Sequence, residues 1–255
     1  MPTLMESTLA PFIPSPRPAL SSIGCRLSDS ADHSAESRTH PTLLTLLRTS
    51  PISSSGRTKH VGTKEWIFGK GDPETQLVFI LVGRVKVSSS SEVGKEIICA
   101  ILGPGELFGE VALLEGMEHS ASVITLEPTD LLAFDRQDFL ALVQEQPPFA
   151  LSLLTTVCSR LRGASELAED ISFLPLPVRL AKRLIALAHS YGIASSRGRR
   201  IGLHLCQQEL ANMVSTTRES VNKQLALWHE EGLISTRKGY LTITHLPTFA
   251  ARHHL

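Results

Sequence analysis

The side chains best suited to bind another molecule are gathered in the stretch QQELANMVSTTRESVNKQL, residues 207–225. Four polar residues lie close together near the start of a predicted helix: Arg218, Glu219, Asn222 and Lys223. An arginine can donate two hydrogen bonds to guanine O6 and N7, and a glutamate can accept one from cytosine N4. Thr217, Lys223 and the backbone N–H groups of a first helical turn suit phosphate groups, which position a helix without specifying sequence. These residue types in this order predict contacts with DNA.

Two short helices joined by a tight turn would position these side chains. Residues 207–213 fit one helix, 215–217 supply the turn with a threonine N-cap, and 218–229 fit a second helix. The apolar residues fall on one face of each helix: Leu210, Met213 and Val214, then Val221, Leu225 and Trp228. Such a pair of helices inserts the N-terminus of the second one into the major groove.

The next stretch, EEGLISTRKGYLTI, predicts a β-hairpin wing. Its Arg237 and Lys238 are placed where DNA phosphates would lie. A helix-turn-helix followed by a basic wing favours DNA binding over the alternative that the polar helix face is merely solvated.

The charge distribution agrees with this prediction. The whole chain of 255 residues has no net charge, with 25 basic and 25 acidic residues. Residues 175–255 contain 11 Lys and Arg against 4 Asp and Glu, a balance of +7, whereas residues 41–174 contain 11 against 17, a balance of −6. The C-terminal part is therefore the expected partner of a polyanion, and chance clustering of surface charge is the alternative.

Composition sets further limits. Apolar residues make up 42% and charged residues 20%, as in ordinary globular proteins. No apolar run approaches the roughly 18 residues that a membrane span needs, and the N-terminus lacks the basic region of a secretory signal. The four cysteines lie far apart at Cys25, Cys99, Cys158 and Cys206. They are expected to be separate reduced thiols in a cytoplasmic protein that does not contact membranes.

The chain divides into four segments of different texture, which together predict an α+β protein. Residues 1–38 are rich in Ser and Pro and predict a disordered tail. Residues 39–146 contain about seven short β-type runs separated by glycine turns, typical of a β-roll or jelly roll. One of these runs is LFGEVALL. Residues 147–174 predict a long helix, followed by a stiff hinge at FLPLP and a polar loop, IASSRGRR, within the last segment, 175–255.

The long helix has a narrow apolar seam. One set of apolar residues recurs every seven positions: Leu154, Leu161 and Ala168. A second set with the same spacing lies three residues further along the chain: Val157, Ala164 and Ile171. Such a seam is typical of helices that associate with a second copy. A single amphipathic helix that packs on its own domain is the alternative.

From IFGKGDPETQLVFILVGRVKV through GPGELFGEVALLEG to QQELANMVSTTRESVNKQL, residues 60–245 resemble the cyclic-AMP receptor protein and fumarate-nitrate regulator family of bacterial transcription factors. The resemblance implies a homodimer whose ligand-binding roll repositions two recognition helices on a pseudo-palindromic operator, with half-sites about 34 Å apart. It also implies RNA polymerase as a further partner. By position, Arg218, Glu219 and Lys223 match the family's base-reading region, and Thr217 and Gln208 match its phosphate contacts.

The resemblance further implies an effector pocket at the loop FGEVALLEGMEHSASV. In family members that bind cyclic nucleotides, a Gly-Glu pair, here Gly109 and Glu110, presents the glutamate to the ribose, and an Arg-Ser-Ala holds the phosphate. This chain has His119-Ser120-Ala121 instead, and Ala164-Ser165 replaces the Thr-Ser that contacts adenine. The implied pocket residues are therefore Gly109, Glu110, His119, Ser120 and Ser165.

The exchange of arginine for histidine leaves the effector open. Arginine offers phosphate a planar, permanently charged fork, whereas a neutral histidine offers one donor. Three alternatives remain: cyclic AMP or cyclic GMP held less tightly, another effector such as cyclic di-GMP held by other basic residues, or a roll without any ligand.

Other functional classes find less support. A metal enzyme of the cupin type needs clustered His and Glu ligands. The β-type runs of the roll offer His60 and His119, with no HxH pair, so no enzyme activity and no metal are expected. An iron-sulfur cluster needs four thiolates, but the N-terminal region has only Cys25. A regulatory module that contacts only proteins remains a rival. DNA affinity that falls with salt would argue against that module.

Overall fold

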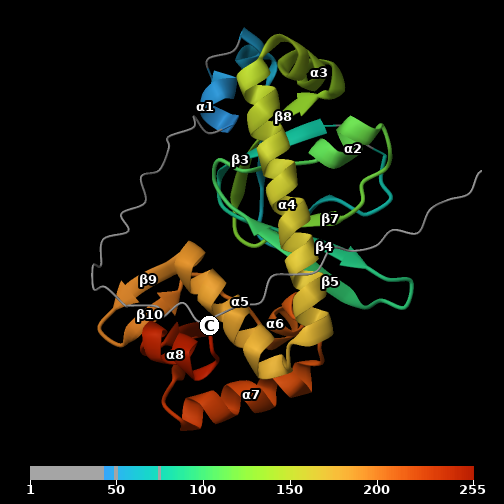
Figure 1. Cartoon of the computed structure of the whole chain (residues 1–255). Helices are drawn as coiled ribbons and strands as arrows, with labels where there is room; N and C mark the ends of the chain where they lie inside the picture. The colour runs from blue at the N-terminus through green and yellow to red at the C-terminus, as the bar shows by residue number, and fades with distance from the viewer. Residues whose placement is uncertain (1–42, 49–50, 74–75) are drawn as a thin grey trace, which may run out of the picture. The chain divides into compact units, whose positions relative to one another are not determined.

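The computed structural model describes residues 43–48, 51–73 and 76–255. The predicted tail, residues 1–38, and Cys25 lie outside the described residues. Within the described part, the predicted β segment forms two antiparallel sheets of four strands, with orders β1-β8-β3-β6 and β2-β7-β4-β5 (Figure 1). The strands of the first sheet are β1 (Arg57–Val61), β3 (Gln76–Val82), β6 (Leu107–Phe108) and β8 (Thr129–Asp135). Those of the second are β2 (Trp66–Phe68), β4 (Val85–Ser90), β5 (Glu96–Leu102) and β7 (Ser122–Thr125).

Strand β3 shows how the roll is held together. Val78 and Ile80 belong to the apolar cluster between the two sheets. Leu77 and Phe79 point the other way, into a second cluster beneath the neighbouring helices. Because alternate side chains of a strand point to opposite faces, a strand buried on both sides has an uninterrupted apolar sequence. This explains why the segment LVFILV shows no alternation of polar and apolar residues.

The prediction that LFGEVALL forms a strand is partly wrong. Only Leu107–Phe108 is β6, and Glu110–Glu115 form helix α2. Gly109 has φ 91°, and a Cβ there would lie 2.5 Å from the carbonyl oxygen of Gln76. A glycine in this left-handed conformation turns the chain away from the sheet. The helix then ends at Gly116, which is also left-handed.

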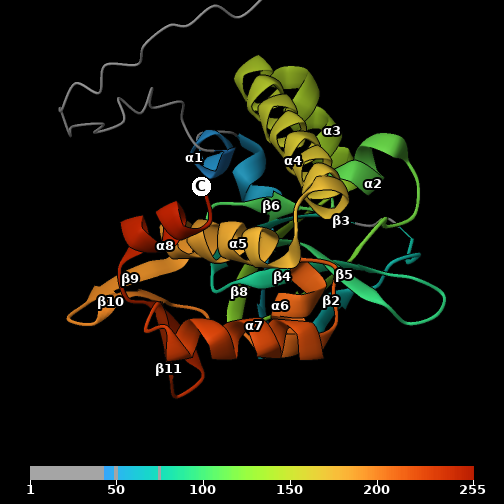
Figure 2. The ribbon, with the colours of Figure 1, turned by 60° about the horizontal axis from the view of Figure 1, so that its bottom comes forward.

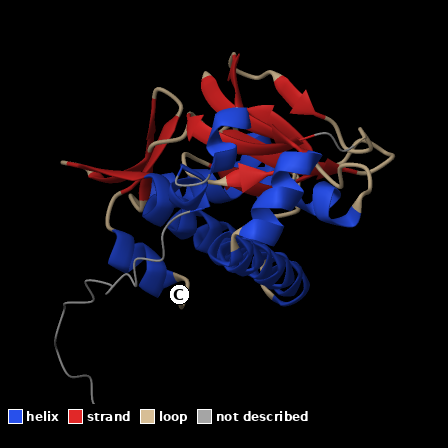
Figure 3. Cartoon of the chain, turned by 90° about the horizontal axis from the view of Figure 1, so that it is seen from above, coloured by secondary structure: helices blue, strands red, loops and turns tan. Residues whose placement is uncertain are grey.

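Helices cover the first sheet. The second apolar cluster joins it to α1 (Leu43–Arg48), α3 (Arg136–Glu145) and the first turns of α4 (Pro147–Phe173), through residues such as Leu47, Phe139 and Phe149. A 3-10 turn, η1 (Pro51–Ser55), precedes β1. Figure 3 shows α4 nearly end-on, outside the sheets of the roll. The predicted long helix is therefore present, with one face on the roll.

The predicted hinge is shorter than its sequence indicates. Only Leu174 and Pro175 separate α4 from α5 (Leu176–Tyr191), because Pro177 occupies the first turn of α5, where proline is tolerated. Lys182 Nζ lies 2.8 Å from Asp170 Oδ1, and Arg179 Nη1 donates to the Ile171 carbonyl oxygen at 3.2 Å. These contacts fasten α5 to the end of α4.

The C-terminal segment contains the predicted winged helix-turn-helix. Its elements after α5 include α6 (Gln207–Met213), α7 (Arg218–Glu230), β11 (Ile234–Arg237), β12 (Tyr240–Ile243) and α8 (Leu246–Arg252). The prediction that IASSRGRR is a polar loop is wrong. This segment belongs to a hairpin of β9 (Gly192–Ser195) and β10 (Gly198–Ile201). This hairpin pairs with the wing in a sheet of order β11-β12-β10-β9. None of the described helices is long and apolar enough to span a membrane.

Candidate functional site

Helix α7 presents a polar N-terminus to solvent. Val221 and Trp228 are buried against the rest of the domain, which fixes the helix by one face. The Thr217 hydroxyl caps the helix by accepting from the Ser220 N–H at 3.2 Å. Arg218, Glu219 and Lys223 are exposed and Asn222 is half-buried. Figure 2 shows α7 lying beside α6, with β11 close by. The predicted DNA-contacting side chains of this helix thus share one accessible surface.

The electrostatics of this surface favour the ionised form of Glu219. The pKa of Glu219 lies below its ordinary value because its own backbone N–H and the Thr217 hydroxyl donate hydrogen bonds to the carboxylate. Glu219 is therefore an acceptor at neutral pH. The turn before the helix contains Ser215 at φ 51°, the left-handed conformation that glycine adopts at lower cost. The serine thus adopts the left-handed backbone of this turn.

The wing is a two-residue hairpin. Arg237 pairs with Tyr240, and Lys238 and Gly239 form the turn at φ 51° and 79°. Arg237 and Lys238 are both exposed, as phosphate contacts require. Behind the turn, the Arg200 guanidinium lies 5.2 Å from the centre of the Tyr240 ring, a cation–π contact that supports the hairpin.

Gln208, the other predicted phosphate contact, lies on α6 and is exposed. Its Nε2 donates to Asn212 Oδ1 at 2.8 Å. Asn212 in turn donates to Glu96 of the roll at 2.6 Å. A side chain at the predicted DNA surface is therefore connected to strand β5 through one residue.

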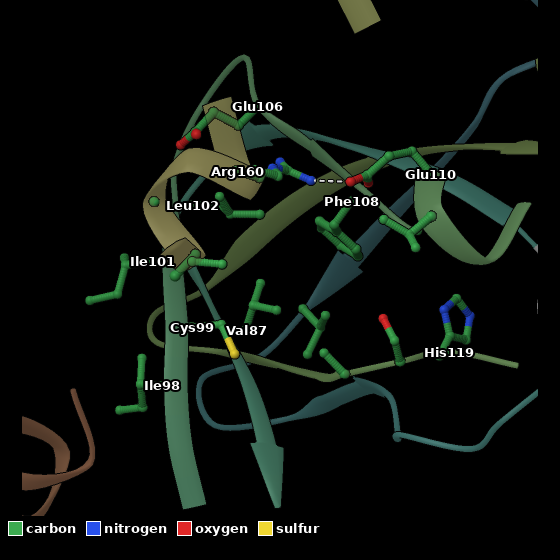
Figure 4. A pocket seen from close by; sticks show the side chains of 18 of the residues that line it. Val87, Ile98, Cys99, Ile101, Leu102, Glu106, Phe108, Glu110, His119 and Arg160 are labelled. Carbon is green, nitrogen blue, oxygen red and sulfur yellow. Dashed lines mark hydrogen bonds and ion pairs between the residues drawn. The ribbon is translucent and has the colours of Figure 1, made fainter. Parts of the chain in front are cut away.

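The roll contains a cavity of about 470 Å³ (Figure 4). Four of the five predicted effector residues line it: Gly109, Glu110, His119 and Ser120. The fifth, Ser165, does not. Its side chain is exposed on α4 and its hydroxyl donates back to the Leu161 carbonyl oxygen at 3.1 Å. Its neighbour Ala164 lines the cavity instead, because one step along a helix turns the side chain by about 100°.

Glu110 is not available as an unpaired acceptor. Its side chain is 2% exposed and forms an ion pair with Arg160 of α4, which Figure 4 shows as a dashed line. Arg160 also donates to the Leu107 carbonyl oxygen at 2.5 Å. No local pattern pairs it with a carboxylate 50 residues away.

His119 is held against an aromatic ring. It is 4% exposed, and its imidazole stacks on Phe68 with ring centres 3.6 Å apart and planes inclined by 6°. The backbone fixes the same residue, since Gly71 donates to the His119 carbonyl and His119 donates to the Asp72 carbonyl. His119 occupies the position at which, according to the resemblance, phosphate would be held. Its side chain is thus part of a packed wall of the cavity.

The outer face of the cavity's strand β5 packs on the helices of the C-terminal segment. Ile98 and Ile101 join the apolar cluster formed mainly by α5, α6 and α7. Tyr191 at the end of α5 donates its hydroxyl to the Ile101 carbonyl oxygen at 2.9 Å. Two residues from beyond the hinge, Arg183 of α5 and Met213 of α6, line the cavity itself.

The predicted seam of α4 is largely uncovered. Leu154 is 58% and Leu161 68% exposed, Ala164 and Ala168 are exposed, and Val157 and Ile171 are half-buried. Leu151, which lies outside the predicted seam, is 65% exposed.

Comparisons with known proteins fit both regions. Residues 58–146 match the cyclic nucleotide-binding domain model, and residues 178–252 match the Crp-like helix-turn-helix domain model. The chain is 34% identical over 177 residues to the cyclic AMP receptor protein of Thermus thermophilus, which covers 69% of this chain and 79% of that protein. The chain belongs to the cyclic-AMP receptor protein family of transcription regulators.

A second relative and a solved structure are also similar to this chain. The CRP-like cAMP-activated global transcriptional regulator of Mycobacterium tuberculosis is 30% identical over 168 residues, 66% of this chain and 75% of that protein. The solved structure of the c-di-GMP-responsive regulator CLP of Xanthomonas campestris matches the fold with a TM-score of 0.68 at 21% identity, over 74% of this chain and 94% of that chain. As a member of the family, this protein is a transcription regulator with a nucleotide-binding-type roll and a DNA-binding helix-turn-helix.

Potential metal ligands are dispersed. Among residues 43–48, 51–73 and 76–255, no three His, Cys, Asp or Glu side chains are grouped closely enough to hold a metal ion.

Proposed function

We propose that the protein is a homodimeric, sequence-specific DNA-binding regulator, and that a small molecule in the roll cavity controls its DNA affinity. One observation carries the DNA-binding part of the proposal. Arg218, Glu219 and Lys223 are exposed together at the capped N-terminus of α7. A helix N-terminus with such residues fits the major groove.

Some of these residues would contact bases and the others would contact phosphates. Arg218 would recognise guanine and Glu219 cytosine, with Asn222 and Lys223 beside them. The remaining contacts would be to phosphates and would orient the protein: Thr217, Gln208, Arg237 and Lys238. The operator would be pseudo-palindromic, because the uncovered seam of α4 fits a second copy of the same helix. Contacts with RNA polymerase and a site of action in the bacterial cytoplasm, where the DNA lies, belong to the same proposal.

The test is selection of duplexes from a random pool with the full chain, repeated with Arg218→Ala and with Arg197→Ala. We expect the wild type to enrich inverted repeats, and Arg218→Ala to lose preference at one guanine per half-site, at a cost of about 1–3 kcal/mol. Arg197 is an exposed arginine of the β9–β10 hairpin, so its replacement removes the same charge from the same region. Unchanged base preference in Arg218→Ala would refute the assigned register of α7.

Effector control rests on the cavity. A volume of about 470 Å³ lies within the range of small-molecule sites, about 300–1,000 Å³. The match to the cyclic nucleotide-binding model and the two cyclic-AMP-dependent relatives support a cyclic nucleotide as the first ligand to test. Cyclic AMP, cyclic GMP and cyclic di-GMP would each be titrated against a fluorescent duplex.

A roll that works without an effector is the second candidate. The ion pair between Glu110 and Arg160 favours it, because the carboxylate expected to meet a ribose already has a partner. A shift in DNA affinity of about tenfold with any of the three nucleotides, equivalent to about 1.4 kcal/mol of coupling, supports a sensor. Unchanged affinity with all three supports the effector-independent roll or an effector of another class.

A further inference from the structure

The cavity wall is mainly apolar. Its lining includes Phe68, Val87, Phe108, Val123, Leu167 and Met213. These side chains come from both sheets of the roll, from α4 and from α6. An apolar wall of this extent favours a ligand with an apolar body, because burial of apolar surface supplies most of the binding free energy.

Four glutamate and arginine side chains also line the cavity, and three of them have partners. Arg160 and Glu110 neutralise each other. Glu106 accepts a hydrogen bond from the Gly103 N–H at 2.7 Å. The fourth is Arg183 of α5, whose Nε is buried without a hydrogen-bond partner. None of the ion pairs found in the described part of the chain includes Arg183.

Removal of the Arg183 side chain from water costs free energy, because its buried Nε has no hydrogen-bond partner. Loss of solvent lowers the pKa of Arg183, and the hydroxyl of Tyr191 is a nearby polar group. A half-buried guanidinium whose Nε has no hydrogen-bond partner is stabilised by an anion, which it can bind through two parallel hydrogen bonds. The position of Arg183 also matters. It belongs to the DNA-binding region, at the opposite side of the hinge from the roll.

We propose that the cavity binds a small monoanion with an apolar body, and that Arg183 binds its charged group. This deepens the effector control proposed above and rests on it. The ligand would contact β5 and α4 with its apolar part and α5 with its anion, so that binding joins the roll to the helix-turn-helix. Its charge would lie at Arg183, away from the packed His119 wall where a cyclic nucleotide would place its phosphate.

A matched pair of fluorescent probes tests the proposal. 1-Anilinonaphthalene-8-sulfonate carries one negative charge on an apolar body, and N-phenyl-1-naphthylamine has the same rings without the sulfonate. Binding of each is measured with the wild type, Arg183→Gln and the control Arg179→Gln. Arg179 lies one turn earlier on α5, also has a buried Nε, donates to Ile171 and does not line the cavity.

We expect the wild type and Arg179→Gln to bind the anionic probe about tenfold more tightly than the neutral one, or about 1.4 kcal/mol. Arg183→Gln should lose this preference and keep its affinity for the neutral probe. Ala100→Phe, which fills the cavity from β5, should lose both probes. Thermal melting of each variant verifies that it is folded.

Two results with the variants would overturn the assignment: an anion preference that survives in Arg183→Gln, or undiminished binding of both probes by Ala100→Phe. DNA affinity measured on the same preparations separates this failure from failure of the proposed function. If the wild type shows no anion preference while cyclic AMP still changes DNA affinity, the inference fails and effector control stands. Loss of selective DNA binding in the wild type refutes the proposed function itself.

Discussion

Glu96 of strand β5 and Asn212 of helix α6 are joined by a hydrogen bond of 2.6 Å, although 116 residues separate them in the chain. Glu96 also forms an ion pair with Lys86 at 3.0 Å, and Asn212 accepts from Gln208 at 2.8 Å. The link therefore runs from a strand of the cavity to the surface where DNA is proposed to bind. It fixes α6 in one position relative to the roll in this conformation.

The first prediction concerns the energy of this link. Glu96→Ala, Asn212→Ala and the double variant form a cycle that isolates the pair from the ion pair with Lys86. We expect a coupling free energy of about 1 kcal/mol, since hydrogen bonds to charged groups contribute about 1.5–3 kcal/mol and this one is partly exposed. Denaturant unfolding of the four proteins measures it. Strict additivity of the two single changes would show that the contact contributes nothing to the folded state.

The second prediction is the pH dependence of the same contact. Burial alone would raise the pKa of Glu96, but hydrogen bonds from Lys86, Ser88 and Asn212 outweigh it and hold the pKa below its ordinary value. A depressed folded-state pKa stabilises the protein fully above the unfolded value, about 4.3 for glutamate, and this stabilisation is lost as the pH falls through the folded pKa. The difference in unfolding free energy between wild type and Glu96→Gln should thus be constant from about pH 7 to 5 and shrink below about pH 4. A difference that grows on acidification would contradict the assigned sign.

The third prediction concerns Glu110 and Arg160. Arg160→Ala leaves a carboxylate that is 2% exposed without its cation, and we expect a loss of about 3 kcal/mol in unfolding free energy. The double change Glu110→Gln with Arg160→Gln should recover part of it, because no charge is left buried. Arg162→Ala, an exposed arginine two residues further along α4, serves as the control and should be neutral. Equal effects of Arg160→Ala and Arg162→Ala would show that the ion pair does not stabilise the roll.

The fourth prediction tests the seam. Leu161→Glu places a charge at a position that is 68% exposed in one chain but buried if two α4 helices pair. We expect the wild type to sediment as a dimer and Leu161→Glu as a folded monomer. Thr155→Glu puts the same charge on an exposed position outside the seam and should remain dimeric. A monomeric wild type would remove the homodimer from the account.

The helix-turn-helix was predictable because its signals are local. The Thr217 cap, the spacing of Val221 and Trp228, and the Lys238-Gly239 turn all lie within a few residues of the elements they define. The segment after Gly109 was mistaken for a strand because six residues are too few to separate a helical from a strand period. The hairpin within IASSRGRR was missed because its β9 strand lacks alternation.

The contents of the cavity were only partly predictable. The resemblance brought Glu110, His119 and Ser120 to one place, and the structure agrees. Arg160 and Arg183 were missed because they reach the cavity from helices far along the chain, and amphipathic spacing does not say which neighbour a polar face meets. Ser165 stays a predicted effector residue that does not line the cavity of this single chain, since a motif match on a helix does not fix which of two adjacent side chains points inward.

The most direct test of the central claim is fluorescence anisotropy with a duplex obtained by the selection described above and a shuffled duplex of equal length. Dissociation constants are measured at several salt concentrations. We expect at least about thousandfold tighter binding of the selected duplex, with affinity for both duplexes falling as salt rises. Equal affinity for the two duplexes, or affinity that does not change with salt, would contradict the claim that this protein recognises DNA through α7 and its wing.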